Sequence, residues 1–580
     1  MPAHEQKEAE FSFKNYFIPF TNAKAIHFLI IIGFLLYCNG LLNGFVGDDF
    51  GQVLNNNLIK SIANLPSFYF SYGIQNILFT YYRPIILTYF TVFYTIFGAN
   101  PFIFHLSQLL FHIASTIVVF LFYRTFFKRY VAFLLSLIFL VHPINSETVL
   151  YISYTQDLLF FFLGMLSLLF LTHIRSNKTI FFACLFTLLS LFSKETGVLF
   201  IPITIVYGFI FAKKYLREIA ISQTTVFIFY FLLRIHAIGL FVKALGSPIG
   251  NLPLSQRFVS MPAIVFFYLK TFFFPLTLAS SYEWIYTSID FVHVILPFFI
   301  DILFAAVVLS LSFILWKKSS HSLFSRFIFF VFWFFLGLLF HLQIISLDQT
   351  VAERWFYFSM VGMLGMIGVL FEAFCVNLKN VFVILFISVI LIFLSIRTFV
   401  RTFDWRDEFT IASHDIATSQ DAWGVENELS YAYFQKGDFK DAKFHAERSI
   451  YLYPYKTNYL NLGAAEMSLS DYASAKKAFM ESIKLGSSNQ AYDNLAFLAL
   501  TYGDPKASMR FLKNSALATY PTDGNLWLCL TALEYNFGDR VAAKIDIAQA
   551  YKYEQNAQVV SVYNAIMNDK PVTIGLTKKL

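Results

Sequence analysis

Charged residues are scarce in this 580-residue sequence. They make up 14% of the chain, whereas 57% is hydrophobic and phenylalanine alone contributes 74 residues. Because a soluble domain carries about a quarter charged residues, most of this chain is expected to lie in lipid. The four cysteines are scattered, three of them inside apolar runs (Cys38, Cys184 and Cys375), so neither a disulfide framework nor a metal site is indicated.

The sequence also shows no sign of a cleavable signal peptide. The first 25 residues are polar and mixed in charge, and no small-residue cleavage site follows the first apolar run. That run is therefore predicted to remain as a signal anchor, with 1–25 as a cytoplasmic N-terminus. The net charge of +7 is spread over short loops, which indicates membrane orientation rather than binding to nucleic acid.

Basic clusters separate the apolar runs up to about residue 400. Lys and Arg gather on the cytoplasmic side and a span needs about 20 apolar residues, so these clusters are placed inside. About eleven transmembrane helices are then predicted, at 26–44, 101–123, 130–144, 157–173, 179–194, 197–212, 220–240, 291–315, 325–345, 356–375 and 380–398. Residues 84–97 and 258–278 would break the charge pattern, so both are expected to lie at the outer surface or to re-enter from it.

After residue 400 the chain becomes polar, Ala-rich and repetitive. Four similar segments align on aspartates that are 33, 33 and 35 residues apart, namely Asp438, Asp471, Asp504 and Asp539. Four positions after each aspartate comes a small residue: Ala442, Ala475, Ser508 and Ala543. This period is typical of tetratricopeptide repeats, whose paired helices approach closely, whereas a generic helical bundle would not keep the register. We expect a linker at 401–420 and about four extracytoplasmic repeats within 421–580.

Asp48 and Asp49 follow the first apolar run almost directly. Two adjacent carboxylates at the edge of a bilayer repel each other, and a structural role as a helix cap would need only one of them. One of the two must therefore find a cation, a proton or a hydroxyl to hold. A functional role is favoured for this pair.

Under the predicted threading, further polar residues from five loops collect on the same outer side. Ionisable groups at the edge of hydrocarbon cost several kcal/mol unless they are paired or wet, so their convergence predicts an active-site cleft rather than a pore. The set comprises Arg83, His142, Glu147, Asp157, Lys194, Glu195, Tyr282, Glu283, Glu353 and Arg354. Structural alternatives stay open: a local Lys194–Glu195 ion pair, a helix end at His142-Pro143, and a buried Glu353–Arg354 pair.

The sequence segments that contain these residues resemble the transmembrane and tetratricopeptide-repeat O-mannosyltransferases. These enzymes belong to the GT-C superfamily of polyprenyl-phosphate-dependent glycosyltransferases. The likeness covers essentially the whole chain. It is carried in order by GFVGDDFGQVLNN, the segment that begins YYRPIILTYF, HPINSETVLYISYTQDLL, SKETG and ERWFYF. Family members usually have Arg two residues before the Asp that matches Asp157, whereas this chain has Thr155. It is also shorter than animal members, with fewer repeats.

The resemblance implies an all-α, GT-C-type catalytic domain at 26–400. Such a domain moves a monosaccharide, a hexose such as mannose, from a polyprenyl phosphate to an extracytoplasmic hydroxyl, with inversion. A hydroxyl needs a carboxylate to take its proton, and the leaving phosphate needs a cation. We therefore predict Asp48 as the general base, with Asp49 positioning the acceptor or tuning its neighbour. Arg354 is the first choice for the phosphate, before Lys194 and Arg83; the other predicted substrate-binding residues are Glu147, Asp157, Glu195, Tyr282 and Glu353.

No cofactor is indicated by a motif, because neither a Gly-rich phosphate loop nor a soluble Asp-x-Asp motif is present; a divalent cation stays open. The expected partners are a polyprenyl-phosphate-linked sugar, membrane lipid, and a protein or glycan acceptor. Protein Ser or Thr is favoured, since stacked helix pairs form a groove for extended peptide. The expected location is a bacterial inner membrane with a periplasmic site, or the lumenal face of the endoplasmic reticulum in a eukaryote.

Two other classes of protein compete with the enzyme. A transporter of lipid-linked sugars would carry polar residues through the bilayer midplane, whereas here they cluster on one face. A non-catalytic scaffold that presents the repeats gives no reason for Asp48 and Asp49.

Overall fold

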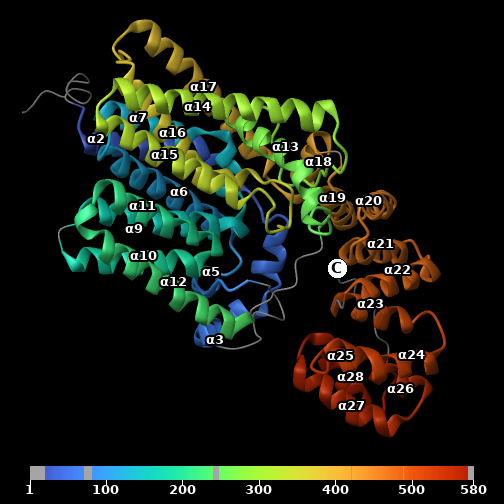
Figure 1. Ribbon diagram of the computed structural model, residues 1–580. Coiled ribbons are helices and arrows are strands. Elements are labelled where there is room, and N and C mark those ends of the chain that lie inside the picture. Colours follow the sequence, from blue (N-terminus) through green and yellow to red (C-terminus); the bar gives the residue numbers. More distant parts are fainter. Residues whose placement is uncertain are drawn as a thin grey trace, which may run out of the picture. The chain divides into compact units, whose positions relative to one another are not determined.

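The computed structural model describes residues 20–70, 81–174, 176–239, 247–419, 421–486 and 489–572. These residues form helices and loops, with an isolated antiparallel bridge between Tyr282 and Val351. Two compact units result, Met1–Thr418 and Ser419–Leu580 (Figure 1). The predicted all-α fold is confirmed. Most of the expected cytoplasmic N-terminus lies outside the described residues.

Among the described residues, 8 helices of the first unit are long and apolar enough to cross a membrane. They include α2 (Asn22–Tyr37), α6 (Pro101–Arg124), α9 (Thr155–Thr172), α12 (Leu216–Ile238), α14 (Leu296–Lys318), α15 (His321–Phe340), α16 (Phe356–Ala373) and α17 (Val381–Asp404). A bent pair, Arg129–Val141 with Pro143–Leu150, brings the number to 9 if it is one span. Membrane-length helices are thus present, as expected of a membrane protein, but a count of eleven is not confirmed.

The shortfall comes from helices that are apolar but short. The predicted spans at 179–194 and 197–212 correspond to α10 (Asn177–Ser193) and α11 (Phe200–Phe211). α10 packs lengthwise on α9, with the Ser167 and Thr187 hydroxyls 2.8 Å apart. The region 84–97 is likewise a short apolar helix, α5 (Pro84–Phe97).

The bend in the ninth candidate span has a local cause. α7 (Arg129–Val141) stops before Pro143, and the chain turns by 53° into α8 (Ser146–Leu150). His142 Nδ1 accepts the Ile144 N–H at 3.2 Å, and its Nε2 lies 2.9 Å from the Phe272 carbonyl oxygen. Both ring nitrogens are thereby engaged in holding the turn, which favours the helix-end interpretation of His142.

Helices of the membrane unit approach closely where residues are small. α15 and α16 lie against each other, and a Cβ added at Gly337 or Gly362 would collide with the neighbouring helix. Close backbone contact through small residues is a common way for helices to associate in lipid. This packing fixes the N-terminal end of α16, where Glu353 and Arg354 lie.

The second unit consists of helix pairs. They are α19 (Trp423–Lys436) with α20 (Phe439–Leu452), α21 (Lys456–Ser468) with α22 (Tyr472–Leu485), α23 (Asn489–Ala499) with α24 (Pro505–Phe511) and its continuation to Thr519, and α26 (Gly524–Phe537) with α27 (Arg540–Tyr553). Each aligned aspartate caps the second helix of its pair by accepting backbone N–H groups near the start of that helix. The repeat signal in the sequence is therefore largely a capping signal.

The predicted small residues behave similarly in three of the four pairs. Ala442, Ala475 and Ala543 are each 0% exposed. Ser508 is only half-buried, and its helix, α24, is followed directly by a π-helical turn at Leu512–Ala516. A further helix, α28 (Ala557–Met567), packs on α27.

The expected linker at 401–420 has a different structure. α17 continues to Asp404, and α18 (Glu408–Thr418) buries Ile411, Ala412 and Asp415. This helix belongs to the first unit, which ends at Thr418. The sequence predicts a linker here because the segment follows the last apolar run, whereas its buried face packs it onto the membrane unit.

Candidate active site at the helix ends

Asp49 is the buried member of the acidic pair. Its Oδ1 accepts the Ser153 N–H at 2.7 Å and the Ser153 hydroxyl at 2.6 Å, and its Oδ2 accepts the Val46 N–H at 3.1 Å. Burial raises the pKa of Asp49 to about 7, the neighbouring Asp48 adds to the shift, and the hydrogen bonds oppose it. This carboxyl group holds the loop after α2 against the segment between α8 and α9.

Asp48 has the opposite environment. Its side chain is exposed, and among the described residues none donates a hydrogen bond to its carboxylate. Its backbone N–H donates to the Tyr151 hydroxyl at 2.5 Å. That contact requires Gly47, whose φ is +49° and whose place a Cβ could not take without colliding with Tyr151. Asp48 is thus fixed by its backbone while its carboxylate remains accessible.

The charge of Asp48 is coupled to its surroundings. The nearby protein displaces much of its water, which raises the pKa of Asp48; Asp348 raises the pKa further and Arg354 lowers it. Glu408 of α18 accepts the Gly47 N–H, and burial raises the pKa of Glu408 to about 7. Several carboxyl groups therefore lie close enough to compete for protons around Asp48.

Glu147 and Arg354 form a buried ion pair beside this acid. Glu147 Oε2 accepts the backbone N–H of Arg354 at 2.8 Å, and its Oε1 accepts the guanidinium Nη1. The side chains are 0% and 4% exposed. The guanidinium carbon also lies 3.9 Å from the centre of the Tyr154 ring. These contacts hold the Arg354 guanidinium in one orientation.

Two further ion pairs continue the site. Lys194 Nζ lies 2.6 Å from Asp157 Oδ1, and burial lowers the pKa of Lys194 while Asp157 opposes that shift. Arg83 Nε lies 2.8 Å from Glu195 Oε2, and its Nη1 donates to Gln156 at 2.7 Å. The alternative of a local Lys194–Glu195 pair is therefore not what forms, since each residue pairs with a more distant partner.

These pairs make one electrostatic cluster. Arg354 interacts with Asp48 and Lys194, and Lys194 interacts with Arg83. The residues come from the loop after α2, the start of α5, the bent α7–α8 segment, the first turn of α9, the α10–α11 junction and the start of α16. The structure thus brings together seven residues that the sequence indicated: Asp48, Arg83, Glu147, Asp157, Lys194, Glu195 and Arg354.

Tyr282 and Glu353 belong to a neighbouring network. Glu353 Oε1 accepts the Tyr282 hydroxyl and the Ala279 N–H, each at 2.7 Å. Asp415 accepts the next N–H of the same loop, from Ser280, at 2.5 Å. Glu353 and Asp415 therefore hold this loop rather than reaching toward Asp48. Glu283 is also buried, at 7% exposed.

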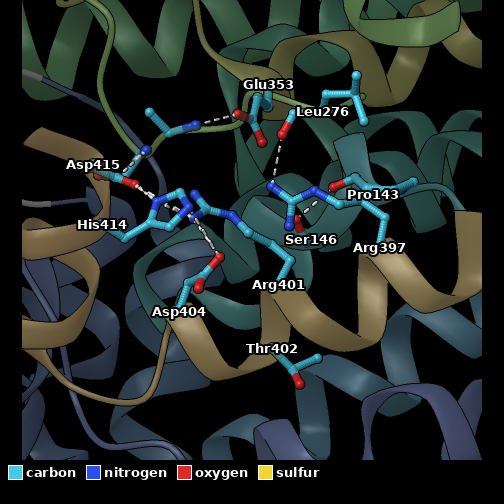
Figure 2. Close-up of polar contacts among 12 residues, drawn as sticks. Pro143, Ser146, Leu276, Glu353, Arg397, Arg401, Thr402, Asp404, His414 and Asp415 are labelled. Carbon is cyan, nitrogen blue, oxygen red and sulfur yellow. Dashed lines mark hydrogen bonds and ion pairs between the residues drawn. The ribbon is translucent and has the colours of Figure 1, made fainter. Parts of the chain in front are cut away.

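Arg401 is a buried cation of this second network (Figure 2). Its Nη1 lies 3.1 Å from Asp404 Oδ2 and 3.4 Å from Asp415 Oδ1, and Arg401 is 0% exposed. Burial would raise the pKa of Asp415, but Arg401, His414 and Ser280 together lower it. The pair Glu353–Arg354 does not form, because Glu353 accepts hydrogen bonds from Tyr282 and Ala279 while Arg354 pairs with Glu147.

Several residues of the site carry no signal in the sequence that singles them out. Asp348 and Glu408 influence Asp48, Ser153 binds Asp49, and Arg401 with Asp415 holds the loop before Tyr282. Arg401 and Asp415 lie in the segment predicted to be a linker, where no site residue is expected. Among the described residues, no group of three or more His, Cys, Asp or Glu side chains could hold a metal ion.

Comparison with known proteins bears only on the repeats. No family model matches the sequence. The BBSome complex member BBS4 of Xenopus tropicalis is 28% identical over 137 residues, which is 23% of this chain and 26% of that protein. The chain thus matches about a quarter of the length of this relative. The match favours a tetratricopeptide-like helical repeat, in agreement with the paired helices of the second unit.

Proposed function

We propose that this protein is a membrane glycosyltransferase that moves a monosaccharide from a polyprenyl phosphate to a hydroxyl acceptor. One observation carries the proposal: an accessible carboxylate, Asp48, lies within electrostatic range of the oriented Arg354 guanidinium, next to the further cations Lys194 and Arg83. The resemblance of the sequence motifs to the GT-C O-mannosyltransferases names the reaction that such an arrangement would serve.

The reaction balances with these groups. Asp48 takes the proton of the acceptor hydroxyl as its oxygen forms a bond to the anomeric carbon of the sugar. The bond from that carbon to the phosphate oxygen breaks with inversion, and the electron pair leaves with the polyprenyl phosphate. Arg354 then faces the charge that develops on the phosphate. Asp49 supports this step by fixing the loop, because both of its oxygens are already occupied.

Charge balance constrains how the phosphate would bind. Each of the three cations already contacts a carboxylate, so a phosphate would share their N–H groups instead of meeting free charges. Both residue types have donors to share: Lys194 carries three N–H bonds on Nζ and Arg354 carries five on its guanidinium. The carboxylates keep the buried cations oriented until the donor lipid arrives.

A protein acceptor fits the helical repeats best. Stacked helix pairs present an extended concave surface that suits an unfolded peptide. The chain leaves the membrane unit from α18, and Glu408 of that helix bonds the loop that carries Asp48. We therefore propose Ser or Thr of an extracytoplasmic protein as the acceptor, with a lipid or surface glycan as the alternative.

The test is transfer of a labelled hexose from a polyprenyl phosphate in membranes that contain the full chain. Asp48→Asn should lower transfer by about 100-fold to 10,000-fold, the contribution of a general base, while the amount of folded protein stays unchanged. Asp290→Asn is the matched control, since Asp290 is another exposed loop aspartate of the same unit, with its side chain 41% exposed. Full transfer by Asp48→Asn would overturn the assignment of the base.

Mass spectrometry then identifies the acceptor. Envelope proteins and glycolipids are compared between cells that lack the protein and cells that carry the wild type. Loss of a hexose from Ser or Thr of particular proteins would support the protein acceptor, and loss from a glycolipid would support the alternative. If neither class of molecule changes, the proposed transferase function fails.

A further inference from the structure

A second charged site lies at the other end of the helical bundle. A cavity of about 580 Å³ opens at the turn between α6 and α7, lined by Arg124, Thr125, Phe126, Phe127, Lys128, Arg129, Tyr130 and Glu372. On α6, His105 contacts the Gly44 carbonyl oxygen beside the candidate active site. Arg124 follows 19 residues later, roughly 28 Å along the helix axis at 1.5 Å per residue. The cavity is therefore separate from the candidate active site.

Within the ranges that the structure describes, the two arginines of this cavity have no acidic partner. The Nε atoms of Arg124 and Arg129 both donate to the neutral side-chain oxygen of Asn22, at 3.3 Å and 2.7 Å. Their remaining bonds go to the backbone carbonyls of Phe127 and Phe20. These bonds orient the two guanidinium groups without neutralising them.

The other two ionisable residues of the lining do not change this balance. Among the described residues, none forms an ion pair with Lys128, which is exposed. The acid of the lining, Glu372, is occupied by Arg326 at 2.8 Å. Three positive charges thus converge here with no carboxylate paired to them from the described part of the chain. In the candidate active site, by contrast, Arg83, Lys194 and Arg354 each have a carboxylate partner.

The position of the cavity in the bundle indicates what kind of ligand it would bind. Arg124 ends one membrane-length apolar helix and Arg129 begins the next apolar segment, so the cavity lies where hydrocarbon gives way to water. The Tyr130 ring is 60% exposed, as is usual for aromatic residues at a membrane interface. Paired guanidinium groups match the geometry of a phosphate, and basic pockets between membrane helices bind acidic head groups.

We propose that this cavity binds the phosphodiester head group of an anionic phospholipid. The two oriented arginines would hold the phosphate oxygens, Lys128 would add the third positive charge, and the apolar rim of Phe126 and Tyr130 would lie against the acyl chains. Neither the sugar donor nor the acceptor of the proposed function is needed for this site.

The experiment measures lipid retention by the purified full chain. Native mass spectrometry in detergent is used to titrate phosphatidylglycerol and phosphatidylcholine, with inorganic phosphate as a separate competitor. We expect phosphatidylglycerol to be retained preferentially. Because a basic residue near an acidic lipid surface contributes about 1 kcal/mol, Lys128→Gln should weaken retention about fivefold.

Two variants make the result specific. Arg124→Gln with Arg129→Gln should lose the preference altogether, but both arginines also hold Asn22, so the exposed Lys128→Gln tests the site if the double variant does not fold. Lys213→Gln with Lys214→Gln is the matched control, since these lysines follow α11 at the same end of the bundle and do not line the cavity. Equal retention of the two lipids, equal weakening by the control, or displacement of the lipid by millimolar phosphate would each overturn the proposal.

Discussion

The Glu147–Arg354 pair allows a quantitative test of the site. Glu147→Gln removes the negative charge but keeps the size of the side chain and one amide oxygen that can accept the Arg354 backbone N–H. Arg354→Met removes the positive charge and keeps an unbranched chain against the Tyr154 ring. The two single variants and the double variant complete a thermodynamic cycle.

The expected magnitudes follow from burial. With side chains 0% and 4% exposed, neither charge can regain water when its partner is lost. Removal of one partner from a buried pair costs about 3 to 5 kcal/mol, whereas replacement of both by neutral groups is often nearly neutral. Each single variant should therefore unfold at a clearly lower temperature than wild type, and the double variant should recover most of that loss.

Thermal unfolding of the detergent-purified chain, followed by tryptophan fluorescence, gives the order of the four midpoints. Hexose transfer is measured on the same samples, and all three variants should be impaired because Arg354 faces the phosphate only when Glu147 holds it. Additive losses in the double variant would show that the two residues do not act as a pair, and would remove the basis for an oriented Arg354.

Three further predictions concern other parts of the structure. Because the pKa of Asp48 is raised, its basic form is lost as pH falls through a value above the ordinary range of an aspartate. Hexose transfer should therefore decline at a higher pH than an ordinary aspartate base would allow, which a pH–rate profile will show. With its pKa raised to about 7, folded Asp49 holds its proton more tightly than the unfolded chain does, so its contribution to stability grows as pH falls from above 7 towards 4. Asp49→Asn should therefore flatten the dependence of the unfolding midpoint on pH between about 4 and 7, and an unchanged slope would contradict the assignment. Asp539→Ala removes the cap that binds the Val541 and Ala542 N–H groups and should cost about 1 kcal/mol in the second unit, detected as faster hydrogen exchange in α27.

The parts of the fold that the sequence predicted are those with local causes. A capping aspartate and the small residue one turn later lie within a few positions of each other, so the sequence alone shows the pattern. The four repeat aspartates indeed cap the starts of four helices. The His142-Pro143 turn is equally local. The number of membrane spans depends instead on contacts between distant segments. α10 and α11 bury part of their surface against neighbouring helices and need not reach full membrane length.

The candidate site likewise has features that the sequence predicted and features that it could not predict. Charged residues at the ends of apolar runs could be predicted to meet, since successive helices return their ends to the same side. Their partners could not: Lys194 is next to Glu195 in sequence but pairs with Asp157, and Glu353 is next to Arg354 but binds Tyr282. The choice of partner depends on the direction in which each helix end leaves the bundle, which the order of residues does not specify.

Asp48 and Asp49 have different roles, which follow from the hydrogen bonds that each of them makes. A buried polar group is tolerated when its hydrogen bonds are made, and Asp49, Glu147 and Asp157 each have such partners from distant segments. Asp48 differs because its contacts with the described residues are made by its backbone, so the energy that fixes its position comes from Gly47, Tyr151 and the neighbouring Asp49. A carboxylate that is held in place by its main chain is free to exchange a proton with an acceptor without breaking any contact that maintains the fold. Because Asp49 makes the contacts that hold the loop, the Asp48 carboxylate can remain accessible at the end of the helical bundle.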